Sequence, residues 1–174
     1  HERHPDKSRE EITKILETEL HQSRTLWLDH GYLEGDDTDA HIDTLARFAS
    51  VDTIIYQGCQ DSSDSHYLEL QTMAKELAAF KQNNGKPYRL FELPWPKPIL
   101  DDGRRLAASY ANFLIINGAV LMPAYGDPMD DNAADVMALA FPGRQIIQIP
   151  CRSLIWQNGS LHCITMQLPE GLVS

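Results

Sequence analysis

The residues most suited to chemistry lie in one short acidic stretch, D-D-T-D-A-H-I-D, between Asp36 and Asp43. It holds four carboxylates and one histidine within eight residues. Burying so many carboxylates costs free energy unless a cation or hydrogen-bond donors meet them. If residues 41–47 are extended, the side chains of His41 and Asp43 point to the same face, because side chains alternate along a strand. The spacing therefore predicts a proton carrier beside a carboxylate, whereas the simpler interpretation is a solvated acidic loop.

The chain has three cysteines, Cys59, Cys151 and Cys163, and their spacings match no zinc or disulfide framework. We therefore expect a reducing, cytoplasmic environment, with at most one thiol that takes part in chemistry. A cysteine nucleophile reacts as the thiolate, which a nearby histidine commonly helps to form. Cys163 follows His162 and is the candidate nucleophile, while Cys59 and Cys151 are interpreted as structural. A buried cysteine is often only a small core residue, and that alternative stays open for Cys163.

Composition bounds the class of protein. With 174 residues, 43% of them hydrophobic and 23% charged, the chain can form about one globular domain. The net charge of −10 argues against a nucleic-acid or anionic-membrane partner and permits a small cationic substrate. No apolar run approaches the length of a membrane span, and no signal-peptide pattern opens the chain.

Hydrophobic periodicity and capping residues predict three helices, which begin near residues 9, 66 and 131. Strands are predicted at residues 25–28, 43–49, 53–56, 88–93 and 145–149, with further hairpins around the Asn-Gly pairs 117–118 and 158–159. The repeated order is helix, strand, long loop and one or two strands, with a period of about 60 residues. We therefore predict an α/β fold of repeated units whose long loops gather on one side, bringing His41 and Asp43 toward Cys163.

Three blocks resemble a known family: G-D-D-T-D-A-H-I-D-T-L-A-R-F from Gly35, R-L-A-A-S-Y-A-N-F from Arg105 and G-S-L-H-C-I-T-M-Q-L-P from Gly159. They resemble the agmatine deiminases of the Porphyromonas-type peptidylarginine deiminase family, within the guanidino-group-modifying enzymes. The resemblance covers nearly the whole chain and implies a pentein α/β-propeller with about three of its five repeat units, an incomplete ring. It also implies that residues 1–174 are the C-terminal part of one catalytic domain whose N-terminal half is absent.

The same resemblance implies a cysteine hydrolase that converts agmatine to N-carbamoylputrescine and ammonia, a step of putrescine and polyamine biosynthesis. Cys163 would attack the guanidinium carbon and form a covalent amidino intermediate, with His41 as general acid and base. Asp43 and Asp37 would bind the guanidinium nitrogens. No metal or other cofactor is implied. Separately, Trp95 lies in a proline-rich loop expected to face the centre, where it could pack on the substrate chain or anchor the loop.

Several alternatives remain open. Free or peptidyl arginine could be the substrate, and Arg104 or Arg105 could then bind a substrate carboxylate. The chain could instead be a non-catalytic fragment or scaffold, because the family's N-terminal half supplies a further substrate-binding aspartate and a catalytic glutamate. We expect the chain alone to be inactive, the missing half to be its partner, and a homo-oligomer to be possible. Ala40 also departs from the family, which usually has glycine there.

A metal site is the remaining alternative. Carboxylates and a histidine at this density can bind Ca²⁺ or Mn²⁺, although the stretch lacks the glycine and the final glutamate of an EF-hand. The ligands would be Asp36, Asp37, Asp39, His41 and Asp43.

Overall fold

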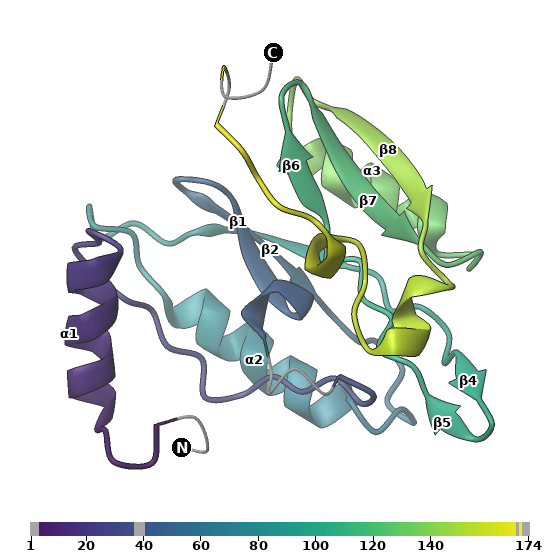
Figure 1. The fold of residues 1–174 in the computed structure, drawn as a ribbon, viewed down its shortest axis with the longest axis horizontal. Helices are drawn as coiled ribbons and strands as arrows, with labels where there is room; N and C mark the ends of the chain where they lie inside the picture. The colour runs from purple at the N-terminus through teal and green to yellow at the C-terminus, as the bar shows by residue number, and fades with distance from the viewer. Residues whose placement is uncertain (1–3, 37–40, 170, 172–174) are drawn as a thin grey trace.

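The computed structural model describes residues 4–36, 41–169 and 171, and Figure 1 shows their arrangement. The helices are α1 (Arg9–Glu19), α2 (Tyr67–Ala79) and α3 (Asp130–Ala140). The strands are β1 (Ala46–Ser50), β2 (Thr53–Gln57), β3 (Arg89–Leu93), β4 (Leu100–Asp101), β5 (Arg104–Arg105), β6 (Leu114–Ile116), β7 (Ala119–Ala124) and β8 (Gln145–Pro150). This mixture of helices and strands confirms the α/β class.

Two units with the same topology make up most of the fold. In the first, β1 pairs antiparallel with β2, and α2 then leads to β3, which pairs parallel with β2. In the second, β6, β7, α3 and β8 repeat that order and those pairing directions. The predicted internal repeat is thus seen as two ββαβ units. The described residues around α1 do not complete a third, because residues 25–28, predicted as a strand, are irregular.

Local sequence explains where several elements begin and turn. The Ser8 hydroxyl accepts a hydrogen bond from the Glu11 backbone N–H, and the Glu11 carboxylate accepts one from the Ser8 backbone N–H, the predicted capping box of α1. Between β6 and β7, Gly118 adopts a φ of 77°, a conformation that glycine takes without steric cost. The predicted two-residue hairpin turn at Asn117 and Gly118 is therefore confirmed.

The two units share one hydrophobic core. Ile55 of β2, Leu93 of β3 and Val120 of β7 are fully buried in a single cluster, together with Met137 on the inner face of α3. Helix α3 therefore packs against strands of both units, as the adjacent sheets in Figure 1 indicate. A second cluster lies under α2, whose residues Leu70, Met73 and Leu77 are buried at helical spacing. The shared core fixes the position of one unit relative to the other.

Three stretches that were expected to be extended contain short 3₁₀-helices instead. The hairpin predicted around residues 158–159 is wrong: Leu154–Gln157 forms helix η2, His162–Ile164 forms helix η3, and Asn158 has a φ of 66° that ends η2. Residues 41–47 are also not extended throughout, because Ile42–Thr44 forms helix η1 ahead of β1. There the backbone N–H and the hydroxyl of Thr44 both donate to the His41 carbonyl, a local contact that competes with strand pairing.

Candidate active site

Helices η1 and η3 bring Asp43 and Cys163 together from distant parts of the sequence. The Cys163 Sγ lies 3.8 Å from the Asp43 Oδ2, in a geometry that lets the thiol donate to the carboxylate. Asp43 is half-buried and Cys163 is exposed. The predicted approach of these two residues is therefore seen, although through turns of helix and not through alternating strand residues.

Asn112, just ahead of β6, bridges these two groups. Its side chain is fully buried. The amide Nδ2 donates to the Asp43 Oδ2 at 2.8 Å and lies 3.4 Å from the Cys163 Sγ. The amide Oδ1 accepts from the His162 backbone N–H at 2.8 Å. One side chain of the second repeat unit thus contacts both helices of the site.

Arg47 of β1 supplies a positive charge at the base of the site. Its guanidinium lies 4.5 Å from the centre of the Phe113 ring and donates to the Phe113 carbonyl. Burial lowers the pKa of Arg47, and the negative charges of Asp43 and Cys163 oppose that effect. The guanidinium is thus held by Phe113 while its charge acts on the carboxylate and the thiol.

The surroundings of His162, beside the candidate nucleophile, favour its neutral form. Burial lowers the pKa of the imidazole most, the Arg47 charge lowers it further, and Asp43 acts in the opposite direction. Its buried Nδ1 has no hydrogen-bond partner among the residues that the structure describes. Proximity in sequence to Cys163 therefore does not make His162 a charged partner of the thiol.

A chain of buried hydroxyl groups fixes the backbone on both sides of the site. The Ser109 hydroxyl donates to the Thr44 carbonyl at 2.6 Å, next to Asp43. The Tyr125 hydroxyl donates to the Ser109 carbonyl at 2.9 Å, accepts from the Ser109 backbone N–H at 3.1 Å and lies 2.9 Å from the Ser160 hydroxyl. Because Ser160 precedes η3, this chain links the two segments that carry Asp43 and Cys163.

Gly159 lies close beside the cysteine. A Cβ atom built at this position would lie 3.1 Å from the Cys163 Cβ and 3.6 Å from its Sγ. The first distance is tighter than an ordinary van der Waals contact, so a side chain here would push against η3. A glycine at this position lets the chain turn into η3 without displacing the thiol.

Of the other predicted site residues, His41 is exposed and occupies the N-cap position of η1, two residues before Asp43. Its role as general acid and base stays a prediction. Asp37, predicted to bind the guanidinium, and Ala40, the departure from the family pattern, lie outside the described residues. So does Asp39, one of the proposed metal ligands. Among the residues that are described, no group of three or more histidine, cysteine, aspartate or glutamate side chains could hold a metal ion.

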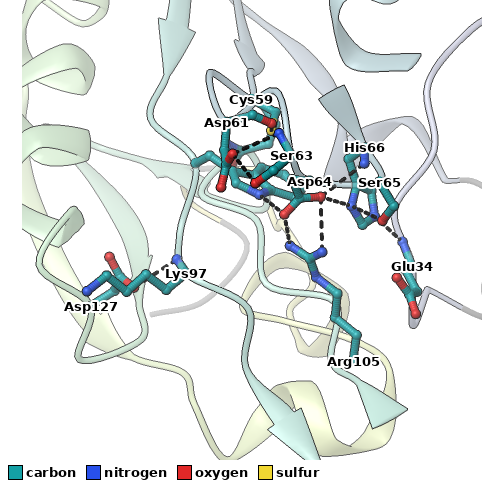
Figure 2. Close-up of polar contacts among 12 residues, drawn as sticks. Glu34, Cys59, Asp61, Ser63, Asp64, Ser65, His66, Lys97, Arg105 and Asp127 are labelled. Carbon is teal, nitrogen blue, oxygen red and sulfur yellow. Dashed lines mark hydrogen bonds and ion pairs between the residues drawn. The ribbon is translucent and has the colours of Figure 1, made fainter. Parts of the chain in front are cut away.

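Trp95 is tied to a buried ionic network. Its indole N–H donates to the Asp64 Oδ2 at 2.9 Å, and the Arg105 guanidinium lies 5.3 Å from its ring centre. Arg105 binds both oxygens of Asp64, at 3.0 and 2.7 Å (Figure 2). These contacts anchor the proline-rich loop, which was one of the two predicted roles of Trp95. Its contact with substrate stays a prediction.

His66 connects this network to the acidic stretch. Its Nδ1 lies 2.7 Å from the Asp64 Oδ1, and its Nε2 accepts from the Glu34 backbone N–H at 2.8 Å (Figure 2). An Nε2 that accepts must be unprotonated, so the proton of the neutral ring lies on Nδ1, which donates to Asp64. The backbone at Glu34, just ahead of the acidic stretch, is thereby fixed to the buried His66 ring, both of whose nitrogens are hydrogen-bonded.

Asn112 and Arg47 are the two site residues that inspection of the sequence did not single out. Both lie within the blocks that carry the family resemblance, and that membership was the available signal.

Comparison with known proteins identifies the family. The model of the "Porphyromonas-type peptidyl-arginine deiminase" family matches residues 1–169. The chain belongs to this family. The agmatine deiminase of Stutzerimonas stutzeri is 31% identical over 189 residues, which cover 98% of this chain and 51% of that protein.

Two solved structures resemble the chain. One, named "Putative Arginine Deiminase from Porphyromonas gingivalis", superposes with a TM-score of 0.91 and 52% identity, over 95% of this chain and 49% of that one. The other is a C. jejuni agmatine deiminase with a cysteine-to-serine substitution and bound substrate. It superposes with a TM-score of 0.83 and 42% identity, over 90% of this chain and 45% of that one. The chain thus spans about half the length of the relatives it matches. Within the described part of this family member, no helix is long and apolar enough to cross a bilayer.

Proposed function

We propose that this chain supplies the nucleophile side of an active site that hydrolyses agmatine to N-carbamoylputrescine and ammonia. The observation that carries the proposal is the contact between the Cys163 Sγ and the Asp43 Oδ2 at 3.8 Å. A carboxylate beside an exposed thiol can hold a planar guanidinium so that its carbon faces the sulfur. Relatives named agmatine deiminase support the choice of substrate.

The proposed reaction has two stages. The Cys163 thiolate attacks the guanidinium carbon, the C–N bond to one terminal nitrogen breaks, and His41 protonates that nitrogen as it leaves as ammonia. Water, activated by His41, then attacks the amidino-thioether carbon. The C–S bond breaks, the sulfur takes back its electron pair, and the oxygen of water remains in the carbamoyl product. Asp43 holds the guanidinium nitrogens, and Asp37 is proposed as a second contact.

The charges at the site favour a cationic substrate. If Asp43 and Cys163 are both deprotonated about 4 Å apart, their repulsion is about 1 kcal/mol in bulk water and about 4 kcal/mol at an effective dielectric constant near 20. A guanidinium that binds Asp43 offsets this repulsion and stabilises the thiolate. Arg47 contributes a positive charge from the buried side. The positive charge of a bound guanidinium therefore favours both its own binding at Asp43 and formation of the Cys163 thiolate.

Deimination of free or peptidyl arginine is the second candidate, and the 52% identity to a structure named as an arginine deiminase favours it. Free arginine brings a carboxylate that needs a cation. Arg105 is bound to Asp64 through both of its terminal nitrogens. Arg104 donates to the Asn158 side chain at 2.5 Å and to the Trp156 carbonyl at 3.2 Å. Because Arg104 and Arg105 are both bound to protein groups, agmatine is our first choice.

The finer architecture is also a proposal. The two ββαβ units support a pentein propeller, of which we expect about three of five units in this chain, with the complementary N-terminal half as its partner. One edge of a guanidinium bound at Asp43 would then face that half. A solvent-exposed ion pair contributes only about 0–1 kcal/mol, so we expect the chain alone to be inactive. We also propose a cytoplasmic location, which the free thiols of the three cysteines support.

The test is to assay the chain alone and combined with the complementary half of the family's domain, with agmatine and with arginine, and to measure the ureido product. We expect product from agmatine in the combined protein, and loss of it in Cys163→Ser with the fold retained. Cys59→Ser and Cys151→Ser serve as controls, because both cysteines are buried. Faster turnover of arginine, or equal loss of activity in all three variants, would contradict the proposal.

A further inference from the structure

The amide of Asn112 has a fixed orientation. Its Oδ1 accepts from the His162 backbone N–H at 2.8 Å, which only an oxygen can do. The amide N–H₂ group must therefore face the other way, where it donates to the Asp43 Oδ2 at 2.8 Å and points its second hydrogen toward the Cys163 Sγ at 3.4 Å. A fully buried side chain thus uses its donors and its acceptor entirely within the candidate active site.

This arrangement serves the two protonation states of Cys163 differently. As a thiol, Cys163 can donate to the Asp43 Oδ2 at 3.8 Å or to the Asn112 Oδ1 at 3.6 Å. Loss of the proton removes both contacts and leaves a sulfur anion beside a carboxylate. Among the hydrogen bonds of Cys163 in the described part of the chain, only that from the Asn112 Nδ2 brings a donor to the sulfur. That hydrogen bond becomes stronger when the thiolate forms.

We propose that Asn112 is a positioning residue of the reaction, which fixes Asp43 relative to Cys163 and donates a hydrogen bond to the sulfur anion. The inference rests on the proposed function, in which Cys163 is the nucleophile. Asn112 is well placed for this role because its own backbone is fixed: its N–H donates to the Ser109 carbonyl, and its carbonyl accepts from the His162 backbone N–H. The rigid second unit therefore sets the geometry between η1 and η3.

The test is the rate at which iodoacetamide alkylates Cys163, measured against pH on the 174-residue chain. Peptide mapping separates Cys163, which is exposed, from the buried Cys59 and Cys151. Asn112→Asp keeps the shape of the side chain but replaces the donor by an acceptor and adds a negative charge. We expect the midpoint of the pH profile to move upward by about 1–2 pH units, because a hydrogen bond to the sulfur anion is lost and a carboxylate is placed beside it.

Two further variants make the test selective. Asn112→Ser removes the amide without adding charge and leaves room for water beside Asp43, so we expect an upward shift of about 0.5–1 pH unit. Asn117→Asp is the matched control, because Asn117 lies on the exposed turn between β6 and β7 and gains the same charge. The control should leave the profile unchanged. A merely structural role of Asn112 would lower the melting temperature of Asn112→Ser without moving its midpoint, whereas Asn112→Asp would still shift through its added charge.

Every outcome decides the proposal. A folded Asn112→Ser variant whose midpoint moves by less than about 0.3 pH unit would overturn it, because any shift in Asn112→Asp would then come from the added charge alone. It is also overturned if neither variant folds while Asn117→Asp does, because Asn112 would then serve only the fold. Alkylation requires no turnover, so a failure of the proposed function, seen as no ureido product from agmatine, is recognised separately. In the combined protein, Asn112→Ser should lower kcat and change KM by less than about twofold.

Discussion

The variant Asp64→Asn tests how much the buried Asp64 network stabilises the fold. The side chain of Asp64 is 4% exposed, and its oxygens accept hydrogen bonds from Arg105, Trp95, and both the ring and the backbone of His66. An amide removes the charge that Arg105 pairs with and turns an N–H₂ group toward donors. Removing one partner of a buried ion pair costs about 3–5 kcal/mol. The Arg105 side chain is 12% exposed, so we expect the lower end of that range.

At this size of domain, a loss of about 3 kcal/mol corresponds to a decrease of about 6–12 °C in melting temperature. The loss also depends on pH. Burial raises the pKa of Asp64, but the hydrogen bonds from Arg105, His66 and Trp95 outweigh burial and hold it well below the ordinary value of 3.8. As the pH falls, the unfolded chain therefore takes up a proton on Asp64 at a higher pH than the folded protein does. The stabilisation is present above the unfolded pKa and is lost as the pH falls through the folded pKa.

The assay is urea unfolding of the parent and the variant at pH 7, pH 5 and pH 3.5, followed by circular dichroism. Because the variant has no carboxyl group to protonate, the difference in free energy of unfolding should narrow as the pH falls. Asp102→Asn is the matched control, since Asp102 is exposed and its φ of 47° suits asparagine equally well. A difference below about 1 kcal/mol at pH 7, or one that grows as the pH falls, would refute the reasoning.

Two further variants test the geometry around the thiol. Gly159→Ala places a methyl group 3.1 Å from the Cys163 Cβ. In the combined protein we therefore expect the rate of ureido product formation to fall about tenfold, with little change in melting temperature. A rate within about twofold of the parent would contradict this expectation. Tyr125→Phe removes the acceptor of the buried Ser109 backbone N–H and a partner of the Ser160 hydroxyl, and it should lower the free energy of unfolding by about 1–3 kcal/mol in urea titrations. Its control is Tyr32→Phe, at a ring that is 51% exposed, and equal effects of the two variants would contradict the argument.

Periodicity and turn residues were sufficient for the regular part of the fold. The capping box at Ser8, the turn at Gly118 and the apolar spacing on α2 each correspond to a local interaction, so they can be inferred from neighbouring residues alone. The repeat followed because two stretches with the same local signals occur in the same order. These are the cases in which local preference and tertiary packing agree.

The turns of the candidate active site could not be inferred in that way. The Asn-Gly pair at Asn158 suggested a hairpin, but Ile155 and Leu161 on either side are buried in the shared core, and this packing holds η2 and the following turn as separate elements. Asn112 could not be recognised as a site residue because its partners, Asp43 and Cys163, are 69 and 51 positions away. Contacts at such separations depend on the packing of whole units, which no local pattern records.

The charges of the site also bear on the choice between agmatine and arginine. Asp43 and a Cys163 thiolate would carry two negative charges, and Arg47 offsets one of them from the buried side, where Phe113 holds it. A bound guanidinium offsets the other on the exposed side. Agmatine carries a second positive charge at its amine, whereas free arginine also carries a carboxylate. A chain with a net charge of −10 attracts the doubly charged cation more strongly. Arg104 and Arg105, which could bind the carboxylate of arginine, are already bound to protein groups. Electrostatics and the hydrogen bonds of these arginines therefore both support the choice of agmatine in the proposed function.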